Sequence, residues 1–193
     1  MSEQSDLRTV TSFEKMSRPM TRNVAFLRGI NVGGHNKVPM AALRKLWSRC
    51  GGMEVRTYLQ SGNVAFEADA PGEVIGSVQT MLREELEIDV SIVWREVGAL
   101  DAAIEADPFG DCMEADERRR FIGFSDRAPS PEAIEALDPD RSPGDRFAVV
   151  GTHIYLDLRE GMGKSKLTND WFEKRLGLAV TFRNYRTVRA MVR

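Results

Sequence analysis

Apolar residues in this chain form short strand-like runs that alternate with stretches of helical spacing. From residue 22 to residue 94 the pattern predicts a strand at 24–27, a helix at 39–50, strands at 55–59 and 64–66, a helix at 74–86 and a strand at 90–94. Pro39 suits the first position of its helix, and Gly51 marks the end of that helix. This β-α-β-β-α-β order is that of a ferredoxin-like unit.

The same order of elements recurs in the second half of the chain. A short helix at 99–105 is followed by a strand at 120–124, a helix at 131–137, strands at 147–150 and 154–156, a helix at 167–176, a strand at 179–182 and a last helix at 185–193. No residue-level repeat joins the two halves. We predict an α+β fold of two ferredoxin-like units in tandem with an extra C-terminal helix, and one continuous α+β sheet is also compatible with the pattern.

Three segments follow from this pattern. Residues 1–20 are polar and lack periodicity, so we expect a disordered extension, or residues upstream of an alternative start at Met20. The first ferredoxin-like unit is expected at residues 21–110. The second unit, with the C-terminal helix, is expected at residues 111–193.

Composition is that of an ordinary soluble protein of 193 residues, with 42% hydrophobic residues and a net charge of -2. No apolar run approaches the ~18 residues that span a bilayer, so no membrane association is expected. The N-terminus has no apolar core of a signal peptide, and Cys50 and Cys112 are the only cysteines, so we expect a cytoplasmic location. Two cysteines and two histidines without close spacing predict no metal site, and no cofactor motif is present.

Charge is unevenly distributed along the chain. Residues 67–117 are rich in Asp and Glu, with Arg83 and Arg95 as their only basic residues, whereas residues 174–193 contain six basic residues and no acidic one. Such asymmetry favours an anionic partner near the C-terminus. An equally good explanation is that the basic end packs beside the acidic middle.

The loop from Arg28 to Lys37 joins the first strand to the first helix and contains Gly29, Gly33 and Gly34. Glycines let a backbone approach a ligand closely, and free N–H groups at a helix N-terminus bind anions. The glycine spacing is not that of a dinucleotide-binding fingerprint. A plain turn explains the glycines equally well, although it requires neither Arg28 nor Asn31.

Two further polar segments are candidates for the same site. In the hairpin at 60–63, Gln60, Ser61 and Asn63 offer hydrogen bonds to a polar ligand, although satisfying the turn is the favoured explanation. The segment at 161–166 resembles the end of a P-loop, but Leu158 stands where that motif requires its first glycine. Ser165 remains a predicted helix N-cap, with Lys164 and Lys166 on either side of it. This arrangement is compatible with an anion-binding site and equally with a capped helix that binds no ligand.

The fourth candidate segment is 181–187, at the start of the last helix. Asn184 is a good N-cap, and Arg183 at the strand end is placed to reach an anion there. Arg186, Arg189 and Arg193 fall on one face of that helix. A solvated outer face explains Arg189 and Arg193 slightly better than a ligand does, whereas a ligand explains Arg183 slightly better.

Motifs at the same four places resemble the domain-of-unknown-function family 1697. They are Phe26-Leu27-Arg28-Gly29-Ile30-Asn31-Val32-Gly33-Gly34, Lys37-Val38-Pro39-Met40, Thr57-Tyr58-Leu59-Gln60-Ser61-Gly62-Asn63-Val64, Gly163-Lys164-Ser165-Lys166-Leu167 and Thr181-x-Arg183-Asn184-Tyr185-x-Thr187. The resemblance spans residues 22–193 and implies an α+β fold of two ferredoxin-like parts in a bacterial protein. It implies no activity, substrate or catalytic residue.

Two functional hypotheses follow. The first is a module that binds a phosphate-bearing or other anionic ligand, either a nucleotide or nucleic acid. The second is an enzyme acting on a small anionic metabolite, with Lys37 or Lys164 as its only evident candidate base. The predicted ligand-binding residues are Arg28, Asn31, Gly33, Gly34, Lys37, Gln60, Ser61, Asn63, Lys164, Ser165, Lys166, Arg183 and Asn184. No prediction of oligomeric state is made, and convergence of the four segments in one pocket would favour a small ligand.

Overall fold

The computed structural model describes residues 19–34, 36–110 and 117–193. Two four-stranded antiparallel sheets contain all its strands, so the alternative of one continuous sheet is excluded for these residues. The predicted extension at 1–20 lies, up to residue 18, outside the described residues.

The first unit has the strand order β2-β3-β1-β4. Its elements are β1 (Thr21–Leu27), α1 (Met40–Arg49), β2 (Met53–Tyr58), β3 (Asn63–Ala68), α2 (Pro71–Leu86), β4 (Ile92–Glu96) and α3 (Val97–Glu105). Helices α1 and α2 cover one face of the sheet, because Leu43, Trp47, Val78 and Leu82 form a buried cluster with its inward side chains. This is the ferredoxin-like arrangement.

The second unit repeats that order as β6-β7-β5-β8. Its elements are β5 (Arg120–Ser125), α4 (Pro131–Glu135), β6 (Arg146–Val150), β7 (His153–Asp157), α5 (Asn169–Leu176), β8 (Val180–Asn184) and α6 (Tyr185–Val192). The prediction of tandem ferredoxin-like units with an extra C-terminal helix is therefore confirmed. Whether residues 21–110 and 111–193 are separate domains stays a prediction.

Two residues that were predicted to start helices, Ser165 and Pro39, do not occupy the predicted positions. Helix α5 begins at Asn169 after an N-cap by Thr168, so Ser165 lies before the helix and does not cap it. The hydroxyl of Thr168 accepts the Trp171 N–H at 3.3 Å, and Thr competes well with Ser for that position. Pro39 precedes α1, which begins at Met40.

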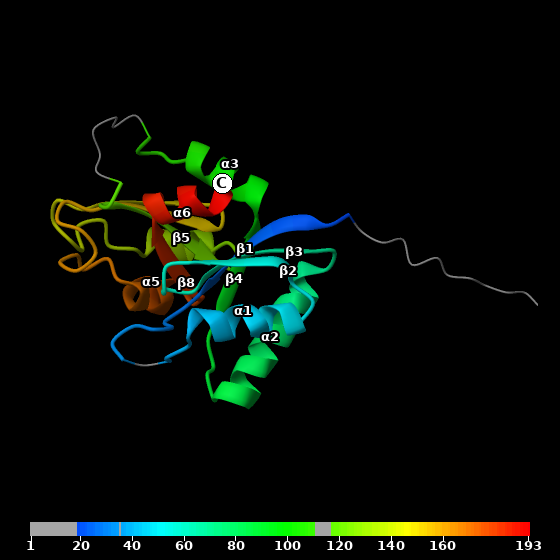
Figure 1. The fold of residues 1–193 in the computed structure, drawn as a ribbon. Helices are drawn as coiled ribbons and strands as arrows, with labels where there is room; N and C mark the ends of the chain where they lie inside the picture. Colours follow the sequence, from blue (N-terminus) through cyan, green and yellow to red (C-terminus); the bar gives the residue numbers. More distant parts are fainter. Residues whose placement is uncertain (1–18, 35, 111–116) are drawn as a thin grey trace, which may run out of the picture.

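A separate buried cluster joins the two units. It contains Phe26 from β1 and Phe124 from β5, whose rings stack with centroids 4.6 Å apart. Leu100 of α3 and Val188 of α6 belong to the same cluster, and Figure 1 shows these two helices side by side, with α1 and α2 on the far side of the first sheet. In the first unit, the sheet face opposite α1 and α2 is thus turned toward the second unit. In the second unit, the sheet face opposite α4 and α5 is turned toward the first.

Candidate functional site

The glycine-rich loop is closed by the side chain of Asn31. Its Nδ2 donates to the carbonyls of Val38 (2.9 Å) and Gln60 (2.8 Å), and its Oδ1 accepts the Val38 N–H at 2.8 Å. Asn31 adopts a positive φ of 54°, which Asn tolerates better than most residues. These bonds fix the loop against the β2–β3 hairpin, so Asn31 uses its polar atoms within the fold.

Arg28 makes a bidentate ion pair with α5 of the other unit. Its Nε and NH2 lie 2.6 Å from the two carboxylate oxygens of Glu173, and NH2 also lies 2.8 Å from Asp170. Burial alone would lower the pKa of Arg28, but the bonds and charges of Glu173 and Asp170 raise it overall. The charge of Arg28 is therefore balanced inside the molecule.

Arg183 of β8 also crosses between the units. Its NH2 donates to the carbonyls of Leu27 (2.8 Å) and Ser61 (3.0 Å), and its Nε donates to Oδ1 of the fully buried Asn63. Burial lowers the pKa of Arg183 to about 10. Gly62, between its two partners on the hairpin, has φ 75° and no room for a Cβ, which would lie 2.8 Å from Leu27.

Parts of three predicted segments meet at one place between the units. Arg28, Ser61, Arg183 and Asn184 line a cleft of about 410 Å³, which we call the junction cleft. Its rim carries the exposed apolar side chains of Val32 and Leu59, which are 61% and 59% exposed.

Several predicted residues lie outside the lining of the junction cleft. On the loop and the hairpin these are Asn31 and Asn63, whose side chains bond within the fold, and the exposed Gly33, Gly34, Lys37 and Gln60. In the segment at 161–166, Lys164 pairs with Glu160 at 2.8 Å on the surface, and the Ser165 hydroxyl accepts the Leu167 N–H at 3.0 Å. The Lys166 backbone N–H is bound by Ser142 at 3.2 Å. The four segments therefore converge only in part.

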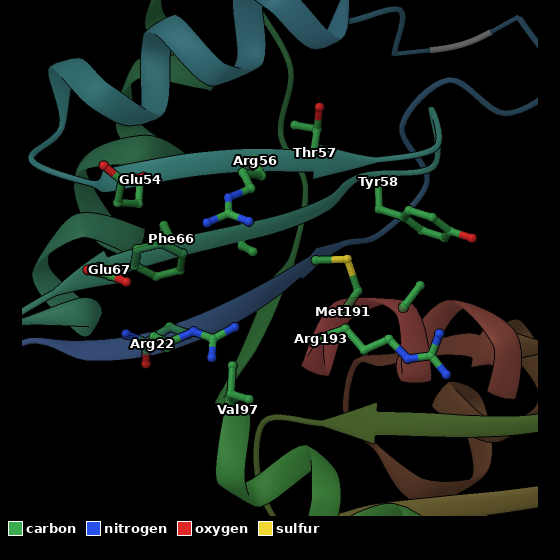
Figure 2. A pocket seen from close by; sticks show the side chains of 13 residues that line it. Arg22, Glu54, Arg56, Thr57, Tyr58, Phe66, Glu67, Val97, Met191 and Arg193 are labelled. Carbon is green, nitrogen blue, oxygen red and sulfur yellow. The ribbon is translucent and has the colours of Figure 1, made fainter.

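A second hollow lies on the face of the first sheet that α1 and α2 leave free. Strands β1, β2 and β3 form its floor, and α3 and α6 form its wall (Figure 2). We call it the arginine groove, since Arg22, Arg56 and Arg193 line it. Its volume is about 200 Å³, and a hollow of about 230 Å³ that shares Tyr58 and Arg193 adjoins it.

The charges of the arginine groove differ along its length. Figure 2 shows Glu54 and Glu67 at one end, with Arg22 beside Glu67, Tyr58 and Arg193 at the other end, and Arg56 between the two ends. The adjoining hollow adds Arg186 and Arg189, of which Arg189 pairs with Glu117 at 3.3 Å.

The arginines of the groove itself are open to solvent. The side chains of Arg22, Arg56 and Arg193 are exposed and bond to no residue that the structure describes.

The second unit contains the same site in a closed form. In the strand register, Arg22 of β1 lies opposite Glu67 of β3, and Arg120 of β5 lies opposite Asp157 of β7. The two arginines therefore occupy equivalent positions in the two sheets. Arg120, however, is only 8% exposed.

In the second unit, residues 107–109, which follow α3, fill the place that corresponds to the arginine groove. The carboxylate of Asp107 pairs with Arg120 and accepts the Tyr185 hydroxyl. The guanidinium carbon Cζ of Arg146 lies over the ring of Phe109, 4.7 Å from the centroid of that ring. The ring of the buried Tyr155 occupies the register position that Ala65 has in the first unit.

The sequence signals this groove only in part. The excess of basic residues at 174–193 includes Arg186 and Arg193, and an anionic partner was expected there. Arg22 and Arg56 were missed, because single arginines at alternate strand positions look like ordinary exposed residues until the sheet order is known. No group of three or more His, Cys, Asp or Glu residues within the described ranges is arranged to hold a metal.

No described helix combines the length and apolarity needed to cross a membrane. Among solved structures, the chain is similar to the conserved bacterial protein SP0830 from Streptococcus pneumoniae, with a TM-score of 0.68 and 23% identity. That match covers 90% of this chain and 97% of the other, and at this identity it supports the fold alone. No curated protein matches the chain. A family model matches residues 20–155, and the chain therefore belongs to the family described as "Protein of unknown function (DUF1697)".

Proposed function

We propose that this protein binds a phosphate-bearing or other anionic ligand in the arginine groove. One observation carries the proposal. At equivalent positions of the two sheets, Arg120 is neutralised by an ion pair with Asp107, whereas Arg22 faces the groove and makes no ion pair with a described residue, although Glu67 lies opposite it in register. Clustered guanidinium groups with free donors are the typical protein groups for phosphate and carboxylate.

The arginine groove suits this role better than the junction cleft does. In the junction cleft, Arg28 already binds two carboxylates and Arg183 already donates to several oxygens. An incoming anion would have to displace these bonds, and the buried acceptors would lose their donors at a cost of about 1–3 kcal/mol each. In the arginine groove the same interactions only have to displace water.

A small ligand fits the groove better than a long RNA strand. RNA-recognition sheets stack two or three bases on aromatic side chains. Along the groove, the sheet face that α1 and α2 leave free offers Arg22, Arg56, Tyr58 and Ala65, with Tyr58 as its aromatic residue. The volume of about 200 Å³, extended by the adjoining hollow, is on the scale of a small phosphorylated molecule.

A thermal-shift screen with inorganic phosphate, nucleotides, sugar phosphates and short oligonucleotides tests the proposal. A ligand present at about 100 times its Kd stabilises the folded state by about 2.7 kcal/mol. We expect Arg22→Ala and Arg56→Ala to abolish the shift, and Arg175→Ala, an exposed arginine on α5, to preserve it.

Variants of the junction cleft show whether the ligand binds there or in the arginine groove. Arg28→Ala and Arg183→Ala are expected to lower the melting temperature of the free protein while the ligand-induced shift persists. If the shift instead survives Arg22→Ala and disappears in Arg28→Ala, the arginine groove is not the site.

A further inference from the structure

The second unit shows what kind of group fits an arginine groove of this architecture. Starting from the proposed function, that the groove of the first unit binds an anion, we propose that this anion is the carboxylate of a peptide segment from a partner protein. The segment carries an acidic residue and, two residues later, an aromatic one. The chain's own Asp107-Pro108-Phe109 is the template for this arrangement.

The template segment has a defined shape. The Phe109 N–H donates to Oδ1 of Asp107 at 2.8 Å, and the Gly110 N–H donates to the Asp107 carbonyl at 3.0 Å. One oxygen of the carboxylate thus orders the turn, while the other pairs with Arg120 and accepts the Tyr185 hydroxyl. The turn places the Phe109 ring beneath a second guanidinium, that of Arg146.

The groove of the first unit presents the matching parts. Arg22 occupies the position of Arg120, and Val97 begins α3 as Tyr185 begins α6. Arg56 and Arg193 supply guanidinium faces on which an aromatic ring can stack, and Tyr58 lies beside them (Figure 2). Ala65 in place of Tyr155 leaves the additional room that an incoming side chain needs.

The acidic end of the groove favours a peptide over a phosphate. Glu54 and Glu67 line the same hollow as Arg22 and Arg56. They repel a doubly charged phosphate more than a singly charged carboxylate. They also accept hydrogen bonds, and a peptide backbone brings N–H donors that a phosphate group lacks.

Fluorescence anisotropy with a labelled synthetic peptide tests the proposal. The probe has the sequence of residues 104–110, and matched peptides carry Asn in place of its Asp or Ala in place of its Phe. We expect saturable binding of the first peptide to the full-length protein, at least a tenfold loss with the Asn peptide, and a smaller loss with the Ala peptide.

Two protein variants locate the binding. Arg22→Ala removes the cation and should weaken binding at least tenfold, while Arg175→Ala should leave it unchanged. Ala65→Tyr keeps every charge and fills the groove as Tyr155 fills its counterpart, so it should abolish binding as well. Circular dichroism and the melting temperature establish that each variant is folded, and Arg22→Ala carries the test if Ala65→Tyr does not fold.

The outcomes separate this inference from the proposed function. Peptide binding that survives Arg22→Ala would mean that the peptide has replaced the resident segment of the second unit, and it overturns the inference. Equal binding of the Asp and Asn peptides overturns it too. If phosphate or nucleotides give an Arg22-dependent thermal shift but the peptide does not bind, the inference fails and the proposed function stands. If neither binds, both fail.

Discussion

The two halves of this chain build the same sheet and use one equivalent arginine in opposite ways. In the second unit, Arg120 is buried and paired with Asp107; in the first, Arg22 lies exposed in a groove. The difference comes from a segment outside the sheet, since the residues after α3 fold onto the second unit. Fold repetition therefore preserves the position of a charge, and the flanking segment decides whether that charge is structural or available for binding.

A second pair of equivalent arginines behaves alike in both units. Arg95 of β4 and Arg183 of β8 each donate from NH2 to the carbonyl at the end of the other unit's central strand, Ser125 for Arg95 and Leu27 for Arg183. Each also donates from NH1 to the residue before it in its own strand. The contrast between Arg22 and Arg120 is therefore specific to the grooves and not a general asymmetry of the two halves.

The largest expected effect is on stability and separates the two groove arginines. Arg120→Ala leaves the Asp107 carboxylate buried without its counter-ion, which costs about 3–5 kcal/mol. Arg22→Ala should change stability by no more than about 0.5 kcal/mol, because its side chain is exposed and makes no bond to the described residues. Urea denaturation of both variants measures the difference. Equal losses would show that Arg22 is structural and that the groove is not an open site.

An intermediate effect is expected from the crossing arginines. Arg183→Met removes donors from the carbonyls of Leu27 and Ser61 and from buried Asn63, at a cost of about 3 kcal/mol. Arg95→Met removes one bond across the units, to Ser125, and should cost about 1 kcal/mol. The same denaturation series checks the order of the two. A larger loss for Arg95→Met would contradict this account of how the units are joined.

The last comparison concerns pH and sets His153 against Asn63, its equivalent by register. Burial, assisted by the charge of Arg95, lowers the pKa of His153 to about 4. An unfolded His takes up its proton near pH 6.5, so stability should fall as the pH drops from about 6.5 toward 4, by about 2 kcal/mol after screening.

The variant His153→Asn supplies the control for this pH dependence. Asn does not titrate, so the variant should lose the part of the acid sensitivity that falls between pH 6.5 and 4. Melting temperatures measured across this range test the prediction. An unchanged pH profile would show that His153 is hydrated and protonates freely.

The fold was largely predictable because hydrophobic periodicity reports local structure. The element order and the tandem ferredoxin-like units followed from it, but the start of α5 did not, because Ser165 and Thr168 are both acceptable N-caps and the difference between them is tertiary. The equivalence of Arg22 with Arg120 was invisible in the sequence, since it is defined by strand register and not by residue identity.

The candidate site was predictable only where composition signalled it. The glycine loop, the hairpin and the start of α6 do converge in part, as their polar residues indicated. The partners of those residues could not be anticipated, because Arg28 and Glu173 lie 145 positions apart. Sequence therefore identified polar groups at element ends, whereas the distinction between paired and unpaired cations required the tertiary structure.

Helix α6 follows the last strand of the second unit but forms a wall of the groove on the first. A molecule held between Arg22 and Arg193 therefore bridges elements from both ends of the chain. Its binding free energy would add to the unfolding free energy of the whole molecule, because neither unit can unfold without dismantling the site. Occupancy of the groove should then be measurable far from it, as slower hydrogen exchange in β5, whose side chains share a core with α6.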